Sequence, residues 1–156
     1  MTTASQTTTT PDFSVARKAM IDSQLRTSGV NEAFVLERMG AVAREDFVPE
    51  QTRGTAYMDR AIRLPGGGYL PSPVFHGMML AEARPRVDDT VLIVSNGSDY
   101  LEELVRPLVA RLDTLPAEAA AGITRRLGPY SLVLVDGAVE HVPAGLAKCV
   151  AEGGRM

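Results

Sequence analysis

Two short apolar runs constrain the fold of this 156-residue chain more than any other feature. The runs VLIVS (91–95) and SLVLV (131–135) are rich in β-branched residues and have no regular polar alternation. Such runs are typical of strands that are buried on both faces, as in a parallel sheet. A weaker run between them in sequence, RLDTL (111–115), is a candidate for a further strand.

Each of these runs is followed by a segment with helical character. We predict helices over 100–109, 117–127 and 143–152, with Pro107 kinking or ending the first of them. The alternation of strand and helix from residue 91 onward is typical of an α/β fold with a parallel sheet. Only about three strands are expected, which makes this sheet small and leaves apolar edges that favour a dimer.

The N-terminal half has a different pattern. We expect one helix that ends at Gly29 and a second whose buried face consists of Phe34, Val35, Leu36 and Met39. The stretch PGGGYLPSP (65–73) predicts an irregular loop. The next helix is expected to begin with Ser72 as its N-cap, because proline in the following position suits the first helical turn.

We therefore divide the chain into three parts. Residues 1–11 are threonine-rich and lack large apolar side chains after the first methionine, so we expect a disordered tail. Residues 12–89 form an N-terminal helical segment that ends in the glycine-rich loop and its helix. Residues 90–156 form the domain that carries the parallel sheet.

Composition limits the class of protein. The chain has 16 basic and 19 acidic residues, a net charge of −3, and no basic block, which argues against nucleic-acid or anionic-membrane partners. No apolar run approaches the ~18 residues of a membrane-spanning helix. The only cysteine, Cys149, cannot form an internal disulfide. Together with an N-terminus that lacks the features of a secretory signal, these observations predict a cytoplasmic protein.

Ligands of parallel α/β sheets bind at the carboxyl ends of the strands, which directs attention to two loops. SNGSD (95–99) has a glycine in its turn, whose backbone amides could hold polar ligand atoms, although a simple turn is the commoner explanation. It matches neither GxGxxG nor GxxxxGK[ST]. In the second loop, DGAVEHV (136–142), Asp136 is a candidate acceptor for a ligand amine or hydroxyl, or else a turn residue.

The remaining reactive side chains have simpler interpretations. His76 lies on an apolar helix face, where a half-buried structural histidine is the commoner case, and His141 is expected at the surface, although an acid–base role there is conceivable. We expect Cys149 to be an inert thiol inside a helix and Met78 and Met79 to belong to the core. The histidine, cysteine and acidic residues do not occur at the spacings typical of metal ligands, so we expect no metal site.

In chain order, four segments resemble protein-L-isoaspartate O-methyltransferases. They are MIDSQLRTSGVNEAFVLERMGAVAREDFVPE (20–50), AYMDRAIRLPGGGYLPSPVFHGMM (56–79), VLIVSNGSDY (91–100) and PYSLVLVDGAVEHVP (129–143). The resemblance implies a Rossmann-like methyltransferase sheet with an N-terminal helical subdomain. It also implies S-adenosylmethionine as cofactor, and isoaspartyl-containing proteins or peptides as substrates whose carboxylate is methylated during repair.

The resemblance also assigns roles to individual residues. Ser95, Asn96, Gly97 and Ser98 fall in the family's cofactor-binding loop, and Asp136 falls at the later strand end, where it would contact the cofactor amine or the substrate side. Ser72 falls in the active-site loop, where it would orient the substrate carboxylate.

The chain departs from the family pattern at the same loop. Of the family's three loop glycines only Gly97 remains, because Ser95 and Asp99 occupy the other two positions. The acidic residue that binds the ribose falls at Pro116, with Glu118 two residues later, and the sheet is truncated. An alternative to an active enzyme is therefore an inactive homologue, or a truncated product, that serves only as a binding or assembly module.

Overall fold

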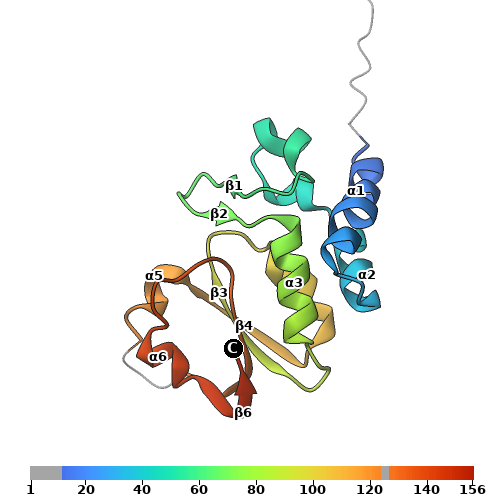
Figure 1. Ribbon diagram of the computed structural model, residues 1–156. Helices are drawn as coiled ribbons and strands as arrows, with labels where there is room; N and C mark the ends of the chain where they lie inside the picture. The colour runs from blue at the N-terminus through green and yellow to red at the C-terminus, as the bar shows by residue number, and fades with distance from the viewer. Residues whose placement is uncertain (1–11, 124–126) are drawn as a thin grey trace, which may run out of the picture.

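The fold is centred on a four-stranded parallel sheet with the order β4-β3-β5-β6 (Figure 1). A computed structural model describes residues 12–123 and 127–156, so the expected tail at 1–11 lies outside the described residues. The strands are β3 (Thr90–Ser95), β4 (Arg111–Pro116), β5 (Tyr130–Val135) and β6 (Val150–Arg155). The predicted α/β class with a parallel sheet is confirmed.

The register brings the carboxyl ends of three strands to one edge of the sheet. Ser95 at the end of β3 pairs with Pro116 at the end of β4, and Val94 pairs with Val135 of β5. The loops after β3, β4 and β5 therefore begin side by side, as a ligand site in this class of sheet requires.

Both faces of the sheet are covered. Val91 and Ile93 of β3 point into one core, and Leu92 and Val94 point into a second core on the opposite face. The first core is closed by α3 (Pro73–Ala83) and α4 (Tyr100–Val105), and the second by α5 (Ala117–Ala120) and α6 (Ala144–Ala147). Burial on both faces explains why these strands are continuous apolar runs.

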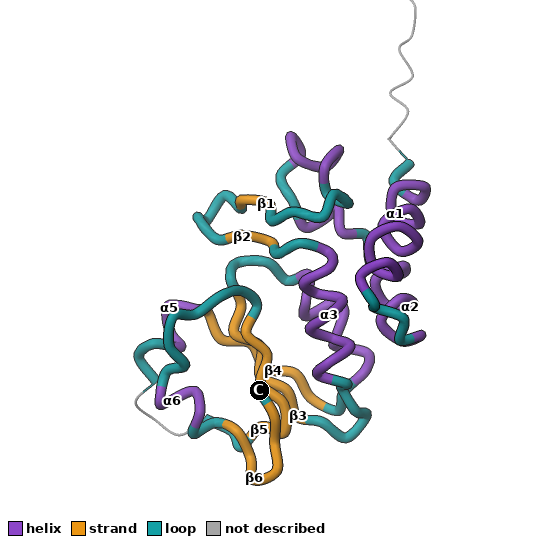
Figure 2. Tube along the Cα trace, in the orientation of Figure 1, coloured by secondary structure: helices purple, strands orange, loops and turns teal. Residues whose placement is uncertain are grey.

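The N-terminal segment packs outside α3 (Figures 1 and 2). Its elements are α1 (Ser14–Met20), a π-helical turn (Ile21–Leu25), 3-10 turns (Arg26–Ser28, Arg44–Phe47 and Glu50–Thr55) and α2 (Ala33–Ala41). The first helical run ends at Gly29, whose φ of 88° is left-handed, as predicted. Helix α3 therefore lies between the sheet and the N-terminal helices.

The glycine-rich segment contains a small hairpin rather than only an irregular loop. β1 (Ile62–Arg63) pairs antiparallel with β2 (Tyr69–Leu70). A Cβ atom on Gly68 would lie 2.0 Å from the backbone oxygen of Asn96. The absence of a side chain at Gly68 therefore lets the hairpin lie directly against the loop that follows β3.

The C-terminal prediction was wrong in one respect. The expected helix over 143–152 is only the short α6, and residues from Val150 form β6, which makes four strands instead of about three. The sequence signal for this strand was weak because β6 contains two glycines, and its pairing with β5 is irregular. β4 and β6 are the edge strands of the described sheet, and the expected dimer stays a prediction.

Other helix predictions need smaller corrections. The helix expected over 117–127 is the short α5 in the described residues, and 124–126 lie outside them. The helix after β3 ends at Val105 and continues as a 3-10 turn, Arg106–Leu108, which agrees with the predicted effect of Pro107. Met78 is exposed rather than in the core, because α3 is apolar on most sides and its pattern does not show which side faces inward.

A half-buried ion pair fastens β6 to the residue before β3. The guanidinium of Arg155 contacts both carboxylate oxygens of Asp89, at 2.6 and 3.2 Å, and its Nε donates to the backbone oxygen of Ala83 at 2.8 Å. Burial opposes ionisation of Asp89, but hydrogen bonds from Arg155 and Ser131 lower its pKa below the usual value. The pair holds an otherwise weak edge strand in place.

Candidate functional site

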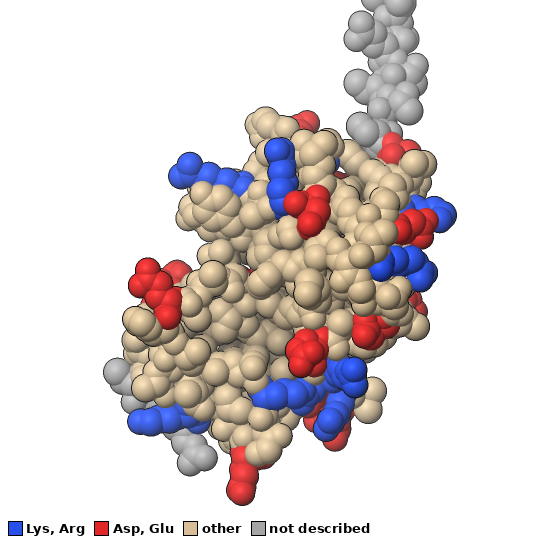
Figure 3. Space-filling view, in the orientation of Figure 1, with Lys and Arg blue, Asp and Glu red and all other residues tan. Residues whose placement is uncertain are grey.

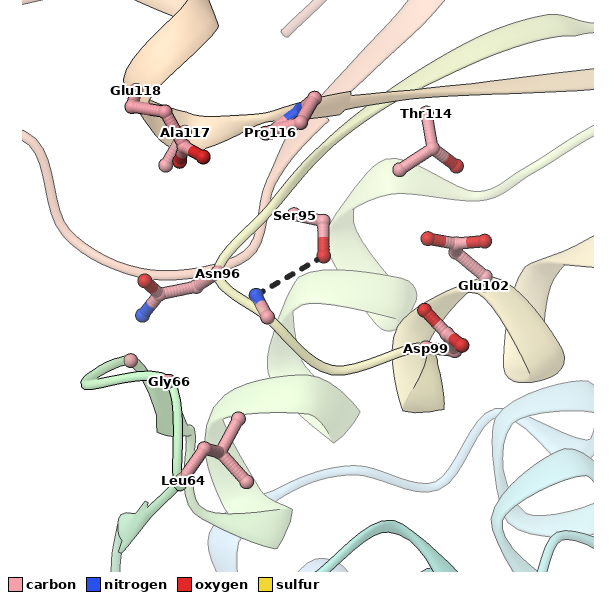
Figure 4. A pocket seen from close by; sticks show the side chains of 12 residues that line it. Leu64, Gly66, Ser95, Asn96, Asp99, Glu102, Thr114, Pro116, Ala117 and Glu118 are labelled. Carbon is pink, nitrogen blue, oxygen red and sulfur yellow. Dashed lines mark hydrogen bonds between the residues drawn. The ribbon is translucent and has the colours of Figure 1, made fainter.

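A cavity of about 380 Å³ opens at the carboxyl ends of β3 and β4 (Figure 4). This volume lies within the range of small-molecule sites. The cavity is lined by residues of the hairpin, of the loop after β3, of α4 and of the end of β4: Leu64, Gly66, Gly68, Ser95, Asn96, Gly97, Asp99, Glu102, Thr114, Pro116, Ala117 and Glu118. We call this space the strand-end cavity.

The loop after β3 is held by its own serine side chains. The hydroxyl of Ser95 accepts from the backbone nitrogen of Gly97 at 3.3 Å (Figure 4) and donates to the backbone oxygen of Ser98 at 3.2 Å. Gly97 has a φ of 93°, whereas Asp99 has a φ of −89°. The turn therefore requires glycine only at Gly97, and the two replaced glycines introduce no backbone strain.

The four loop residues play different parts. Ser95, Asn96 and Gly97 line the cavity, whereas the hydroxyl of Ser98 accepts from the backbone nitrogen of Tyr100 at 3.2 Å. Ser98 is also buried. Its side chain thus fixes the start of α4.

Carboxylates dominate the charge of the strand-end cavity. Asp99 and Glu102 lie close together at one end, and Glu118 lies on the far side (Figure 4). Burial raises the pKa of Glu102, and the charge of Asp99 acts in the same direction. No lysine or arginine lines this cavity among the described residues. Sequence reasoning noted Glu118 but missed Glu102, because a glutamate in a helix is ordinarily solvent-exposed.

Asn96 lies where the strand-end cavity meets two others. It also lines a cavity of about 380 Å³ with Asp136 and His141, and one of about 640 Å³ that reaches Ser72. Its side-chain nitrogen donates to the backbone oxygen of Tyr69 at 3.4 Å, which joins the loop to the hairpin. We name these spaces the Asp136 cavity and the Ser72 cavity.

Ser72 caps α3, as the sequence predicted. Its hydroxyl accepts from the backbone nitrogen of Phe75 at 3.4 Å and lines the Ser72 cavity. Arg60, Asp59 and Tyr69 line the same cavity, so a cation, a carboxylate and two hydroxyls line this space. Sequence reasoning missed Arg60, since its neighbourhood depends on the hairpin fold.

A buried network of charged side chains lies beneath these cavities. The Nε2 of His76 lies 2.8 Å from the Oδ1 of Asp136, and its Nδ1 lies 3.4 Å from a guanidinium nitrogen of Arg44. All three side chains are almost completely buried. Arg44 also donates to the backbone oxygens of Ala56, at 2.7 Å, and of Pro71. We call these three side chains the Arg-His-Asp network.

The proton arrangement of this network follows from burial. Burial lowers the pKa of His76, which favours the neutral ring although the bond to Asp136 opposes this effect. A neutral ring that donates from Nε2 to Asp136 accepts at Nδ1 from Arg44. The other carboxylate oxygen of Asp136 is buried without a partner in the described part of the chain. The predicted half-buried histidine is thus fully buried, because polar partners accompany it.

Other candidates lie outside these contacts. His141 is exposed at the rim of the Asp136 cavity. Cys149 is buried as predicted, but it lies beyond the end of α6 rather than inside a helix. Across residues 12–123 and 127–156, no three histidine, cysteine or acidic side chains gather in a metal-binding group. Within the same ranges, every helix is too short or too polar to cross a membrane.

Comparison with known proteins identifies the family of the chain. The family model for protein-L-isoaspartate(D-aspartate) O-methyltransferase matches residues 15–115. A protein-L-isoaspartate O-methyltransferase of Koribacter versatilis (strain Ellin345) is 30% identical over 168 residues, which cover 92% of this chain and 76% of the relative. The chain belongs to the protein-L-isoaspartate O-methyltransferase family. A relative of the same name from Roseiflexus sp. (strain RS-1) is 30% identical over 169 residues, covering 93% and 77% of the two chains.

A solved structure shows the same fold. A protein-L-isoaspartate O-methyltransferase chain superposes with a TM-score of 0.66 at 15% identity, over 88% of this chain. The aligned region is 53% of that chain, so the present chain spans about half of the solved structure. The Rossmann-like methyltransferase fold that the sequence implied is confirmed.

Proposed function

We propose that this chain transfers a methyl group from S-adenosylmethionine to the carboxylate of an isoaspartyl residue in a protein or peptide. The observation that carries the proposal is the meeting of two cavities at Asn96. One is a cofactor-sized space at the strand ends, and the other is an open space that Ser72 and Arg60 line. Membership of the family supplies the reaction class.

The strand-end cavity fits the cofactor in size and in chemistry. S-adenosylmethionine supplies an electrophilic methyl group on a positively charged sulfur. The backbone of Gly97 and the side chain of Asn96 offer polar atoms to it, and Asp99 suits its ammonium group. Glu118 suits the ribose hydroxyls, since Pro116 has no side-chain acceptor for them.

Two of the predicted site residues act less directly in this proposal. Ser98 holds the loop by accepting from the backbone nitrogen of Tyr100, and Ser95 holds it by accepting from the backbone nitrogen of Gly97.

Asp136 has a direct role in this proposal. It offers its unpartnered carboxylate oxygen to a ligand amine in the Asp136 cavity, while its other oxygen stays bonded to His76.

The substrate side needs orientation more than acid–base chemistry. A carboxylate is ionised at neutral pH, so it attacks the methyl carbon without a general base. The new oxygen–carbon bond forms as the carbon–sulfur bond breaks, and the electron pair stays on sulfur. Ser72 and Arg60 provide a hydroxyl donor and a cation that would hold the substrate carboxylate. The carboxylate of Asp59 lines the same cavity, but one of its oxygens accepts from the backbone nitrogen of Val74.

The proposal is tested by transfer of a radiolabelled methyl group to an isoaspartyl peptide, with the normal aspartyl peptide as control. We expect labelling of the isoaspartyl peptide alone. Ser72→Ala should lower the rate by roughly tenfold to a hundredfold, since it removes an orienting donor. Absence of transfer by a folded chain would leave the binding-module alternative in place.

Loss of the α3 cap must be separated from loss of the orienting hydroxyl. Ser72→Asp retains a capping oxygen and therefore preserves folding, but it places a negative charge beside the substrate carboxylate. We expect Ser72→Asp to lose transfer at least as severely as Ser72→Ala. Equal activity of Ser72→Asp and the parent chain would exclude the proposed role. Arg60→Met removes the cation from the Ser72 cavity and should also lower transfer. Arg86→Met, at an exposed residue that does not line this cavity, is its matched control.

A further inference from the structure

The chain exposes aromatic side chains at a single place. Of its four tyrosines and four phenylalanines, all of which lie in the described ranges, only Tyr69 and Phe75 are exposed, at 48% and 38%. Both line the Ser72 cavity. Single exposed apolar side chains are ordinary in soluble proteins, but two aromatic side chains on one concave surface are typical of a binding site.

The Ser72 cavity is larger than a carboxylate requires. Its volume of about 640 Å³ lies well inside the range of pockets that enclose drug-sized ligands, whereas a carboxylate is a small group. Besides its polar groups, the lining contains the apolar side chains of Ala61, Pro71 and Ala138. The substrate carboxylate therefore leaves apolar wall uncovered, and the rings of Tyr69 and Phe75 are the largest apolar groups in that wall.

Both aromatic residues belong to backbone that is held in place. The backbone oxygen of Tyr69 accepts from the side-chain nitrogen of Asn96 at 3.4 Å, which joins β2 to the loop after β3. The backbone nitrogen of Phe75 donates to the hydroxyl of Ser72 at 3.4 Å, and the Phe75 ring packs edge to face with the ring of His76, with centroids 5.8 Å apart. A wall that is positioned before binding loses little conformational entropy when a ligand covers it.

We propose that the Ser72 cavity selects substrates in which an apolar or aromatic residue lies next to the isoaspartyl residue, through Tyr69 and Phe75. This inference rests on the proposed function, because it takes the Ser72 cavity as the substrate side. Phe75 follows Ser72 by one helical turn, so a peptide whose carboxylate contacts Ser72 has its neighbouring side chain within reach of the Phe75 ring. Covering the rings removes apolar surface of both partners from water.

The proposed contact lies away from the reacting atoms. It is therefore the same before and during methyl transfer, and it lowers KM with little change in kcat. By contrast, loss of the orienting hydroxyl of Ser72 should act mainly on kcat. The two kinetic constants thus separate selection of the neighbouring residue from orientation of the carboxylate.

The test measures kcat and KM for a set of isoaspartyl peptides that differ only in the residue before or after the isoaspartyl residue. That residue is glycine, threonine, lysine, valine or phenylalanine. We expect a kcat/KM roughly tenfold higher for phenylalanine than for glycine, mostly through KM. Valine should exceed threonine, which has a similar shape but carries a hydroxyl group.

Substitutions connect this preference to the two rings. Phe75→Ala and Tyr69→Ala should each reduce the phenylalanine-to-glycine ratio severalfold, and the double variant should bring it close to one. Phe75→Leu retains an apolar side chain and should keep most of the preference. Met78→Ala is the matched control, because Met78 is an exposed apolar residue of α3 that does not line the cavity. It should leave the ratio unchanged.

The adverse outcomes are distinguishable. Equal use of the phenylalanine and glycine peptides, a preference for lysine, or a ratio that both alanine variants leave unchanged overturns selection by the rings, while methyl transfer stands. A dimer in sedimentation that Phe75→Ala dissociates identifies a second copy of the chain as the partner that covers the rings, and it also overturns the inference. Absence of transfer to every isoaspartyl peptide by a folded chain overturns the proposed function together with this inference.

Discussion

The strand-end cavity and the Arg-His-Asp network hold charge in opposite ways. In the network, Arg44, His76 and Asp136 lie in contact and are almost completely buried. In the cavity, Asp99 and Glu102 have the same sign and face an open space. The first arrangement pairs its groups within the chain, except for one carboxylate oxygen of Asp136, and the second leaves its charges to a ligand.

The difference separates residues that hold the site together from residues that bind. The network joins three parts of the chain, namely the 3-10 turn that contains Arg44, helix α3 and the end of β5. It sets where the loop beginning at Asp136 lies. Away from the site, the face drawn in Figure 3 shows acidic and basic side chains interspersed. The uncompensated charge of the cavity is therefore a local feature.

The largest effect is expected from breaking the network. Arg44→Met removes the buried guanidinium that donates to His76 and to the backbone oxygens of Ala56 and Pro71, so we expect a loss of about 3–5 kcal/mol in the free energy of unfolding. Arg106→Met, which removes only a solvent-exposed guanidinium beside Glu102, should cost less than about 1 kcal/mol. Denaturant unfolding measures both, and similar losses would remove the distinction between the two regions.

The next effect concerns the contact between the hairpin and the cavity loop. Gly68→Ala places a Cβ atom against the backbone oxygen of Asn96, so the hairpin must move away. We expect a loss of about 1–3 kcal/mol in stability and a weaker affinity for S-adenosylmethionine. Gly54→Ala is the control, because Gly54 has open space around it and does not line the cavity. Unfolding and titration of the two variants check this prediction, and identical affinities would contradict it.

The network should also make stability depend on pH. Because the folded pKa of His76 is lowered, the unfolded chain binds more protons as the pH falls through the ordinary histidine value near 6.5. Stability is therefore present above that pH and declines below it, by up to about 1.4 kcal/mol per pH unit. His76→Gln should flatten this slope between pH 7.5 and 5.5, whereas His141→Gln at the exposed position should retain it. A parent chain equally stable across this range would contradict a buried neutral His76.

The smallest effect on stability is expected inside the cavity. The raised pKa of Glu102 means that its ionised form is disfavoured in the folded chain, so its contribution to stability declines as the pH rises through its titration range. Glu102→Gln should therefore leave the melting temperature at pH 7 unchanged or slightly higher. The same variant should bind S-adenosylmethionine less tightly. A clear loss of stability would place Glu102 with the residues that hold the fold together.

The sequence predicted the sheet well where its strands are buried. β3 and β5 are apolar runs because helices cover both faces, and the pattern shows this directly. β6 escaped notice because it is an edge strand with two glycines, and its position depends on the Arg155–Asp89 pair rather than on apolar pattern. Local pattern does not reveal an element that a distant side chain holds in place.

The site was predicted in part for the same reason. The loop after β3 and the cap of α3 are local features, so Gly97 and Ser72 could be found from sequence. The pairing of His76 with Asp136 joins residues 60 positions apart, and Glu102 enters the cavity only because α4 packs against one face of the sheet. These roles depend on contacts between segments that are far apart in the sequence, and the spacing of residues in a single sequence does not show such contacts.

The most direct test of the central claim is hydrogen–deuterium exchange of the chain with and without S-adenosylmethionine. We expect the cofactor to slow exchange at 64–70, 95–102 and 114–118, which contain the lining of the strand-end cavity. Backbone amides around Arg44 should be unaffected, because Arg44 is buried and lines none of the three cavities. Protection around Arg44 with none at 95–102 would contradict the division between a binding region and a holding region.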